Sequence, residues 1–185
     1  MKFSSHPPTL PKIDELAHDT LVLAHFADER PLRGIGGLVD WRLNGKLSQL
    51  MVAEHITGQW GEQLMYPQGG RLPFEKVIYF GLGDRSKFGS TRFREVTHRI
   101  MRTLLRVGVS SFAMGLPGRD VLKLVPRQAI DIWLTEFQKV FVSARFNELS
   151  LDISLLESSD IHSEMDEQLD AFTRQYGPGS GDSRR

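Results

Sequence analysis

Short apolar runs rich in β-branched residues alternate with longer amphipathic segments along this chain, and this alternation limits the folds that it can adopt. The clearest run covers residues 76–80 (KVIYF) and ends in Gly81-Leu82-Gly83. In residues 91–107, apolar side chains recur at helical spacing on one face, and Gly108 is suited to end such a helix. Strands that alternate with helices predict a three-layer α/β domain, in which helices cover both faces of a largely parallel or mixed sheet.

The other predicted elements follow the same pattern. Three further apolar runs predict strands, at residues 20–26, 62–66 and 109–114. Two further periodic segments predict helices, at residues 38–51 and 126–145, and Gly45 predicts either close packing or an early break in the first of these. Ser90 or Thr91 is placed to cap the 91–107 helix.

The ends of the chain predict three more segments. Residues 149–155 alternate apolar and polar side chains, which predicts a half-exposed strand at an edge of the sheet. Residues 161–176 predict an acidic amphipathic helix. We expect one domain over residues 19–176, preceded by a flexible segment (1–18) and followed by a disordered tail (177–185).

Composition restricts the chemistry that is available. The chain has no cysteine, which excludes disulfides, thiolate metal sites and cysteine nucleophiles. No segment approaches the roughly 18 apolar residues of a membrane span, and the N-terminus lacks a signal-peptide pattern. We therefore expect a soluble, cytoplasmic protein with no membrane partner.

The charge is balanced overall but uneven along the chain. The formal net charge is zero, which argues against a protein that coats nucleic acid. Residues 71–106 hold nine basic side chains against three acidic ones, whereas residues 151–185 hold eight acidic against three basic. A basic face therefore stays possible.

Three stretches resemble the N-terminal, non-catalytic domain of leucyl aminopeptidases. They are residues 20–50, including GGLVDWRLNGKLSQL; the turn and strand around Gly58-Gln59-Trp60-Gly61-Glu62; and residues 77–83 (VIYFGLG) with the helix that begins near Arg92. The resemblance covers roughly residues 19–154 and implies a fold related to the macro domain.

The same resemblance argues against peptidase activity in this chain. The catalytic half of that family normally follows this domain with a two-metal site, but no Asn-Thr-Asp-Ala-Glu-Gly-Arg motif occurs here. The nearest acidic cluster lies on the predicted C-terminal helix and lacks that pattern: Glu164, Asp166, Glu167 and Asp170. The six histidines have no metal-ligand spacing, and no Gly-x-Ser-x-Gly motif occurs. We expect no catalytic residue, no metal and no cofactor.

Two glycine-bearing turns follow predicted strands and precede predicted helices. Such turns can present backbone amides and a helix N-terminus to a phosphate group. In macro domains two turns of this kind flank the ADP-ribose diphosphate, so the resemblance makes a nucleotide-binding or ADP-ribose-binding module one hypothesis. The simpler interpretation is that these glycines only allow tight turns, since neither matches a full dinucleotide or Walker pattern. The residues are Gly34, Gly36, Gly37, Gly81 and Gly83.

A row of arginines follows the polar face of the 91–107 helix. Arg92, Arg99, Arg102 and Arg106 recur at helical spacing and could contact a nucleic-acid backbone, as the N-terminal domains of some related aminopeptidases do. Alternatively, these arginines form a solvated face or pair with the acidic C-terminal helix. A DNA-contacting accessory protein is therefore another hypothesis.

The leading hypothesis is a non-catalytic interaction or scaffold protein that keeps the aminopeptidase N-terminal fold without the catalytic half. A predicted edge strand and the uneven charge both favour self-association or a protein partner. Trp41 lies off the main leucine stripe of its predicted helix and is a candidate contact residue.

Overall fold

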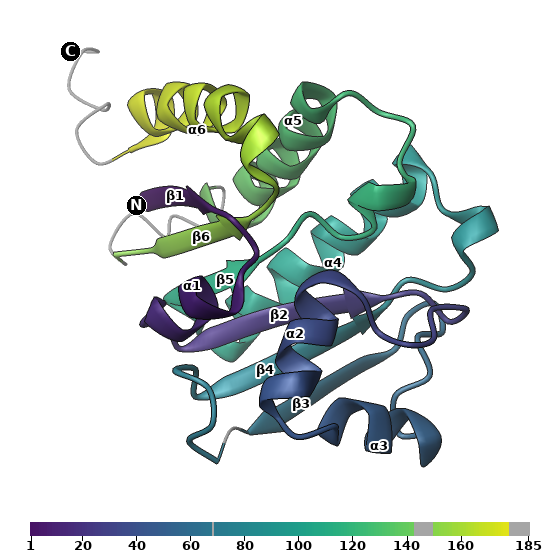
Figure 1. Cartoon of the computed structure of the whole chain (residues 1–185). Helices are drawn as coiled ribbons and strands as arrows, with labels where there is room; N and C mark the ends of the chain where they lie inside the picture. The colour runs from purple at the N-terminus through teal and green to yellow at the C-terminus, as the bar shows by residue number, and fades with distance from the viewer. Residues whose placement is uncertain (68, 143–149, 178–185) are drawn as a thin grey trace, which may run out of the picture.

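A computed structural model describes residues 1–67, 69–142 and 150–177, in which a six-stranded mixed sheet lies between two helical layers (Figure 1). The strand order is β1-β6-β5-β2-β4-β3, and all neighbouring pairs are parallel except β3 and β4. This arrangement confirms the predicted α/β class. The strands are β1 (Lys2–His6), β2 (Thr20–His25), β3 (Gln63–Pro67), β4 (Lys76–Gly81), β5 (Ser111–Met114) and β6 (Asp152–Leu156).

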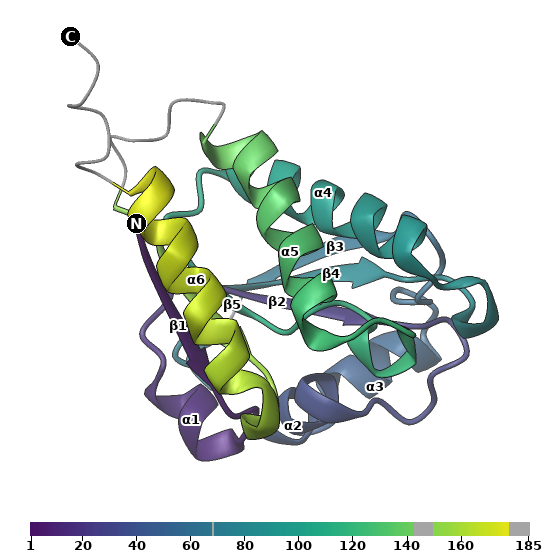
Figure 2. The ribbon, with the colours of Figure 1, turned by 90° about the horizontal axis from the view of Figure 1, so that it is seen from above.

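The helical layers bury opposite faces of the central strands (Figure 2). Along β2, Leu21 and Leu23 pack toward α1–α3, whereas Val22 packs toward α4–α6. This alternation follows from the period of two of a β-strand, and it explains why a central strand reads as a continuous apolar run. The helices are α1 (Leu10–Glu15), α2 (Gly34–Arg42), α3 (Lys46–Val52), α4 (Ser90–Val107), α5 (Pro126–Phe137) and α6 (His162–Tyr176).

Helix α4 confirms the helix predicted over residues 91–107. Its apolar face is fully buried at Phe93, Ile100 and Leu104, and Gly108 ends it in the left-handed conformation (φ 75°). The predicted cap is wrong, because Gly89 occupies the N-cap position and no side chain caps the first turn.

The helix predicted over residues 38–51 is two helices, α2 and α3, that meet at Asn44 and Gly45. Both residues have positive φ (61° and 75°), which ends one helix and begins the next. The carboxylate of Asp40 accepts a hydrogen bond from the Ser48 amide at 3.0 Å and so ties the two helices together. The early break suggested by Gly45 is therefore observed.

The edge strand predicted over residues 149–155 is wrong, because β6 lies inside the sheet. It pairs with β5 on one side and with β1 on the other, and Ile153 and Leu155 are fully buried. Residues 1–18 are accordingly not a segment outside the domain: they contain β1, which covers this edge, and α1. Position 149 lies outside the described residues.

The helix predicted over residues 126–145 begins at Pro126 as expected. Helix α5 ends at Phe137 and continues as a π-helical turn over Gln138–Val142. The rest of that prediction, residues 143–145, lies outside the described residues, as does most of the predicted tail (178–185). The helix predicted over residues 161–176 is confirmed as α6, preceded by the short 3-10 turn η5 (Ser159–Ile161).

Strand β1 should contribute measurably to stability. Phe3 makes edge-on ring contacts with three aromatic side chains of α5 and α6, namely Trp133, Phe137 and Phe172, at centroid distances of 6.2, 5.4 and 6.0 Å. We expect Phe3→Ala to lower the free energy of unfolding by about 2–3 kcal/mol, measured by urea denaturation. Lys2→Ala, at an exposed neighbour, is the control. Equal stability of the two variants would show that β1 adds little to the fold.

Candidate functional site

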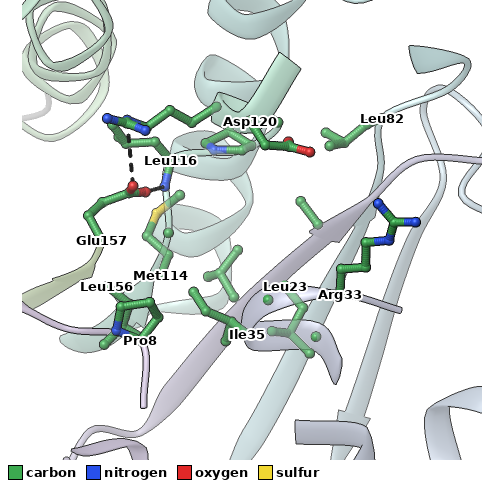
Figure 3. Close-up of a pocket in the computed structure, with 18 of the residues that line it drawn as sticks. Pro8, Leu23, Arg33, Ile35, Leu82, Met114, Leu116, Asp120, Leu156 and Glu157 are labelled. Atoms are coloured by element: carbon green, nitrogen blue, oxygen red, sulfur yellow. Dashed lines mark hydrogen bonds and ion pairs between the residues drawn. The ribbon is translucent and has the colours of Figure 1, made fainter. Parts of the chain in front are cut away.

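The candidate site lies where the chain leaves the carboxyl ends of two neighbouring strands in opposite directions. Strand β2 leads to α2 on one face of the sheet, whereas β5 leads to α5 on the other. Connections that diverge in this way leave a crevice at the ends of the strands. A pocket of about 470 Å³ occupies this position. We call it the switch-point pocket (Figure 3).

Most of the lining of the switch-point pocket comes from the end of β2, the loop that leads to α2, the start of α2, the loop after β5 and the residues that follow β6. Pro8, Leu82 and Ile100 complete it. Most of the lining is apolar, and charged side chains stand among it. The apolar residues include Val22, Leu23, Ile35, Met114, Leu116 and Leu156. The charged residues are Glu29, Arg33, Arg119, Asp120 and Glu157.

One wall of the pocket is held by Arg85, from the 3-10 turn η1 (Arg85–Lys87). Its guanidinium donates to Asp120 at 2.8 Å and to Glu29 at 3.3 Å. It also lies 4.7 Å from the centroid of the Phe26 ring. These contacts join the loop after β2 to the 3-10 turn η2 (Arg119–Val121).

Glu157 is the buried carboxyl group of the pocket. One carboxyl oxygen accepts a hydrogen bond from the Leu116 amide at 2.6 Å, and the other lies 3.6 Å from Nε of Arg119. Burial raises the pKa of Glu157 to about 7, against the opposing effects of the Leu116 amide and Arg119. Figure 3 shows Glu157 and Arg33 on opposite sides of the pocket.

Of the five glycines predicted to bind a ligand, two line the switch-point pocket and three do not. Gly34 and Gly36, at the start of α2, line the switch-point pocket. Gly37 does not, because its α-carbon faces the Leu32 backbone. Gly81 and Gly83 also lie outside the lining: the backbone at Gly58 and Gln59 packs against them, and the Gly83 amide donates to the Gly58 oxygen at 2.8 Å.

The second loop of the pocket, Gly115-Leu116-Pro117-Gly118, was not predicted. The sequence carries a signal for it, since two glycines directly follow the predicted strand over residues 109–114. The pairing of β5 with β2 places this loop beside the start of α2, whereas Gly81-Leu82-Gly83 contributes only Leu82 to the lining. At Gly115 an added Cβ would lie 3.0 Å from Cδ1 of Ile35, so the two loops are in contact.

The four arginines predicted to contact nucleic acid lie in two different environments on α4. The guanidinium groups of Arg92 and Arg99 both lie over the indole ring of Trp60, at 5.0 and 4.7 Å from its centroid. Arg102 and Arg106 are exposed, and neither has a hydrogen bond or ion pair to another described residue. The structure therefore leaves two of the four predicted arginines available to a polyanion.

The remaining candidates have simpler environments. Trp133 is fully buried, whereas Trp41 on α2 is 70% exposed. Burial lowers the pKa of His25 to about 4. Within residues 1–67, 69–142 and 150–177, no three His, Asp or Glu side chains come together as metal ligands would. No helix in the described part of the chain is long and apolar enough to span a bilayer.

The buried carboxyl of Glu157 predicts a pH-dependent stability difference. Its pKa is 4.5 when unperturbed and about 7 in the folded state, so the folded chain retains a proton that the unfolded chain releases. This group therefore destabilises the fold progressively as the pH rises through this window, by about 3 kcal/mol in total. We expect Glu157→Gln to gain stability over the wild type between pH 5 and pH 8 in urea denaturation. The same difference at both pH values would contradict this prediction.

The sequence of residues 22–130 matches the N-terminal domain of the cytosol aminopeptidase family. Among curated relatives, a probable cytosol aminopeptidase of Alkaliphilus metalliredigens is 31% identical over 91 residues, which cover 49% of this chain and 18% of that protein. A probable cytosol aminopeptidase of Thermosynechococcus vestitus is 28% identical over 132 residues, 70% of this chain and 26% of the relative. The chain thus spans about a fifth to a quarter of the length of these relatives.

Solved structures show the same fold at low sequence identity. A tomato leucine aminopeptidase mutant aligns with a TM-score of 0.59 and 13% identity, over 94% of this chain and 36% of that one. A Trypanosoma brucei macrodomain in complex with ADP-ribose aligns with a TM-score of 0.67 and 20% identity, over 90% of this chain and 68% of that one. Together with the match of residues 22–130, these findings show that the chain belongs to the cytosol aminopeptidase family and carries its N-terminal, macrodomain-like domain.

Proposed function

We propose that this chain is a non-catalytic domain that binds an adenosine-containing small molecule in the switch-point pocket. The observation that carries the proposal is the pocket itself, about 470 Å³ between the start of α2 and the loop after β5. This volume lies within the range of about 300–1,000 Å³ that is usual for small-molecule sites. The Trypanosoma brucei macrodomain has been solved with ADP and with ADP-ribose, which suggests the ligand class to test.

The lining fits a ligand with a flat apolar part and a polar part. The apolar residues of β2 and β5 can bury a base and sugar, since burial of apolar area is the main favourable contribution to binding. Gly34 has positive φ (51°), and no atom lies within 4 Å of the position that a Cβ would take. A ligand can therefore approach the backbone closely at the N-terminus of α2, where amides lack helical partners.

The non-catalytic part of the proposal rests on which part of the family matches. Residues 22–130 match the N-terminal domain, and the relatives extend well beyond the length that this chain covers. The ionisable side chains among the described residues that line the pocket are two arginines and three carboxyl groups, and the lining includes no histidine or lysine.

Calorimetric titration with ADP-ribose and with adenosine at pH 6 tests the proposal. We expect saturable binding of both ligands by the wild type. Ala24 lines the pocket, so Ala24→Leu should fill part of it and weaken binding at least about tenfold, the loss of roughly 1.4 kcal/mol of binding free energy. Ala53→Leu adds the same side chain at an exposed position away from the lining and should bind like the wild type. No heat from either ligand at millimolar concentration would overturn the proposal.

Self-association through α2 is a second candidate, favoured by one observation. Trp41 leaves 70% of its surface exposed, and large apolar side chains in this state are frequent at protein interfaces. Because β6 lies inside the sheet, it offers no free edge for self-association. The exposure of Trp41 is therefore the observation that supports this candidate.

Trp41→Ala tests the second candidate by light scattering across a wide range of protein concentration. We expect the wild type to form dimers or larger species and the variant to stay monomeric, with little change in unfolding free energy because the side chain is exposed. Val125→Ala, at another exposed apolar residue (59%), should associate like the wild type. A wild type that is monomeric throughout would overturn this candidate.

A further inference from the structure

We propose that the Glu157 carboxylate lies beside the position where a ligand phosphate would approach the loop after β5, and that its charge thereby determines which ligands the switch-point pocket accepts. In its ionised form Glu157 excludes phosphate-bearing ligands and leaves uncharged nucleosides unaffected. In its neutral form it admits a diphosphate. This inference rests on the proposed function, because it concerns ligand selection at the same pocket.

The first step is that the Glu157 carboxylate contacts two groups of this loop that could otherwise bind an anion. The Leu116 amide donates to one carboxyl oxygen at 2.6 Å, and Nε of Arg119 lies 3.6 Å from the other. Nε of Arg119 is buried and has no hydrogen-bond partner among the described residues, so its contact with Glu157 is an ion pair only. A phosphate that approaches the Leu116 amide or the Arg119 guanidinium would therefore lie against this carboxylate.

The second step is that the carboxylate is held in place by its own backbone. The Glu157 amide donates to the His6 oxygen at 2.9 Å, at the end of β1. The Glu157 carbonyl oxygen accepts from Nε2 of His162 at 2.7 Å. Because both backbone groups are bonded, the chain cannot easily carry the side chain out of the pocket.

The third step is that Gly115 brings the start of α2 and the carboxylate close together. Cδ1 of Ile35 lies 3.0 Å from the position of a Cβ on Gly115, and the Glu157 oxygen lies 3.5 Å from the same position. A diphosphate that enters between α2 and this loop must therefore lie next to the carboxyl group. Two negative charges in such contact repel strongly at low effective dielectric.

The charged surroundings do not neutralise Glu157 fully. Arg119 faces it from η2 and His162 from α6, whereas Asp160 faces it from η5 with like charge. His6, whose backbone bonds to Glu157, has its own pKa lowered by burial and by Lys12. Burial dominates over these contacts and keeps the pKa of Glu157 near 7, so both protonation states are accessible around neutral pH. The neutral acid can donate a hydrogen bond to a phosphate oxygen instead of repelling it.

Calorimetric titration of the full chain with ADP-ribose at pH 6 and pH 8 tests the inference, with adenosine as the uncharged comparison. ADP-ribose is preferred to ADP because a terminal phosphate would itself titrate near pH 6. We expect the wild type to bind ADP-ribose about tenfold more weakly at pH 8, since the neutral fraction of a group with a pKa near 7 falls by about this factor. Adenosine should bind equally at both values.

Glu157→Gln is the diagnostic variant, because its amide oxygen can still accept from Leu116 but carries no charge. We expect it to bind ADP-ribose with the same affinity at pH 6 and pH 8, about tenfold tighter than the wild type at pH 8. His162→Gln keeps a donor to the Glu157 carbonyl and should retain the pH dependence of the wild type. If the pH dependence survives in Glu157→Gln and disappears in His162→Gln, the assignment to Glu157 is wrong.

The outcomes separate this inference from the proposed function. Binding of adenosine together with equal ADP-ribose affinity in the wild type and in Glu157→Gln at pH 8 overturns the inference alone. Absence of adenosine and ADP-ribose binding by every protein at both pH values overturns the proposed function and the inference with it. Equal affinity of the wild type for ADP-ribose at pH 6 and pH 8, with adenosine bound at both, also overturns the inference, even if a variant does not fold.

Discussion

The structure depends on the pairing of β2 with both β4 and β5 at the centre of the sheet. This strand is buried on both faces, so its apolar side chains alternate between two separate core clusters. The chain leaves β2 toward the α1–α3 layer and leaves β5 toward the α4–α6 layer. The switch-point pocket lies at the ends of these two strands, where the two connections diverge.

Two buried carboxyl groups show how the same residue type serves different purposes. On α5, Glu136 is surrounded by Lys139, His98 and Arg94, at 2.7, 3.0 and 3.3 Å. Burial opposes its ionisation, but hydrogen bonds from these three side chains outweigh burial and hold its pKa below the ordinary value. Glu136 therefore joins α5 to α4 as a charged cross-link.

Glu157 has the opposite balance. Its close donor is one neutral amide, and Arg119 stands further away at 3.6 Å, so burial prevails and its pKa rises. A carboxyl group in this state costs stability at neutral pH and stabilises no cross-link between helices. A buried carboxyl group with a raised pKa at the wall of a pocket is typical of a ligand-binding site.

The sequence by itself determined the class of the fold and the elements that carry it. Three patterns depend only on residues that are close in sequence, so they can be recognised without the rest of the chain: the apolar run at 76–80, the helical periodicity at 91–107 and the helix end at Gly108. The family resemblance was likewise legible, because it depends on the order of local motifs such as residues 77–83.

Only the tertiary structure decided which segments meet. Strand β1 joins residues 2–6 to residues 152–156, and this pairing turns the predicted edge strand into an interior one. The loop that faces α2 follows β5 and not β4, because β5 pairs with β2 on the side where the connections diverge. Glu157 reaches Leu116 across 41 positions of the chain. The spacing of neighbouring residues does not predict such contacts, because they depend on the order of the strands in the sheet. That order is determined by the packing of all the strands and helices together.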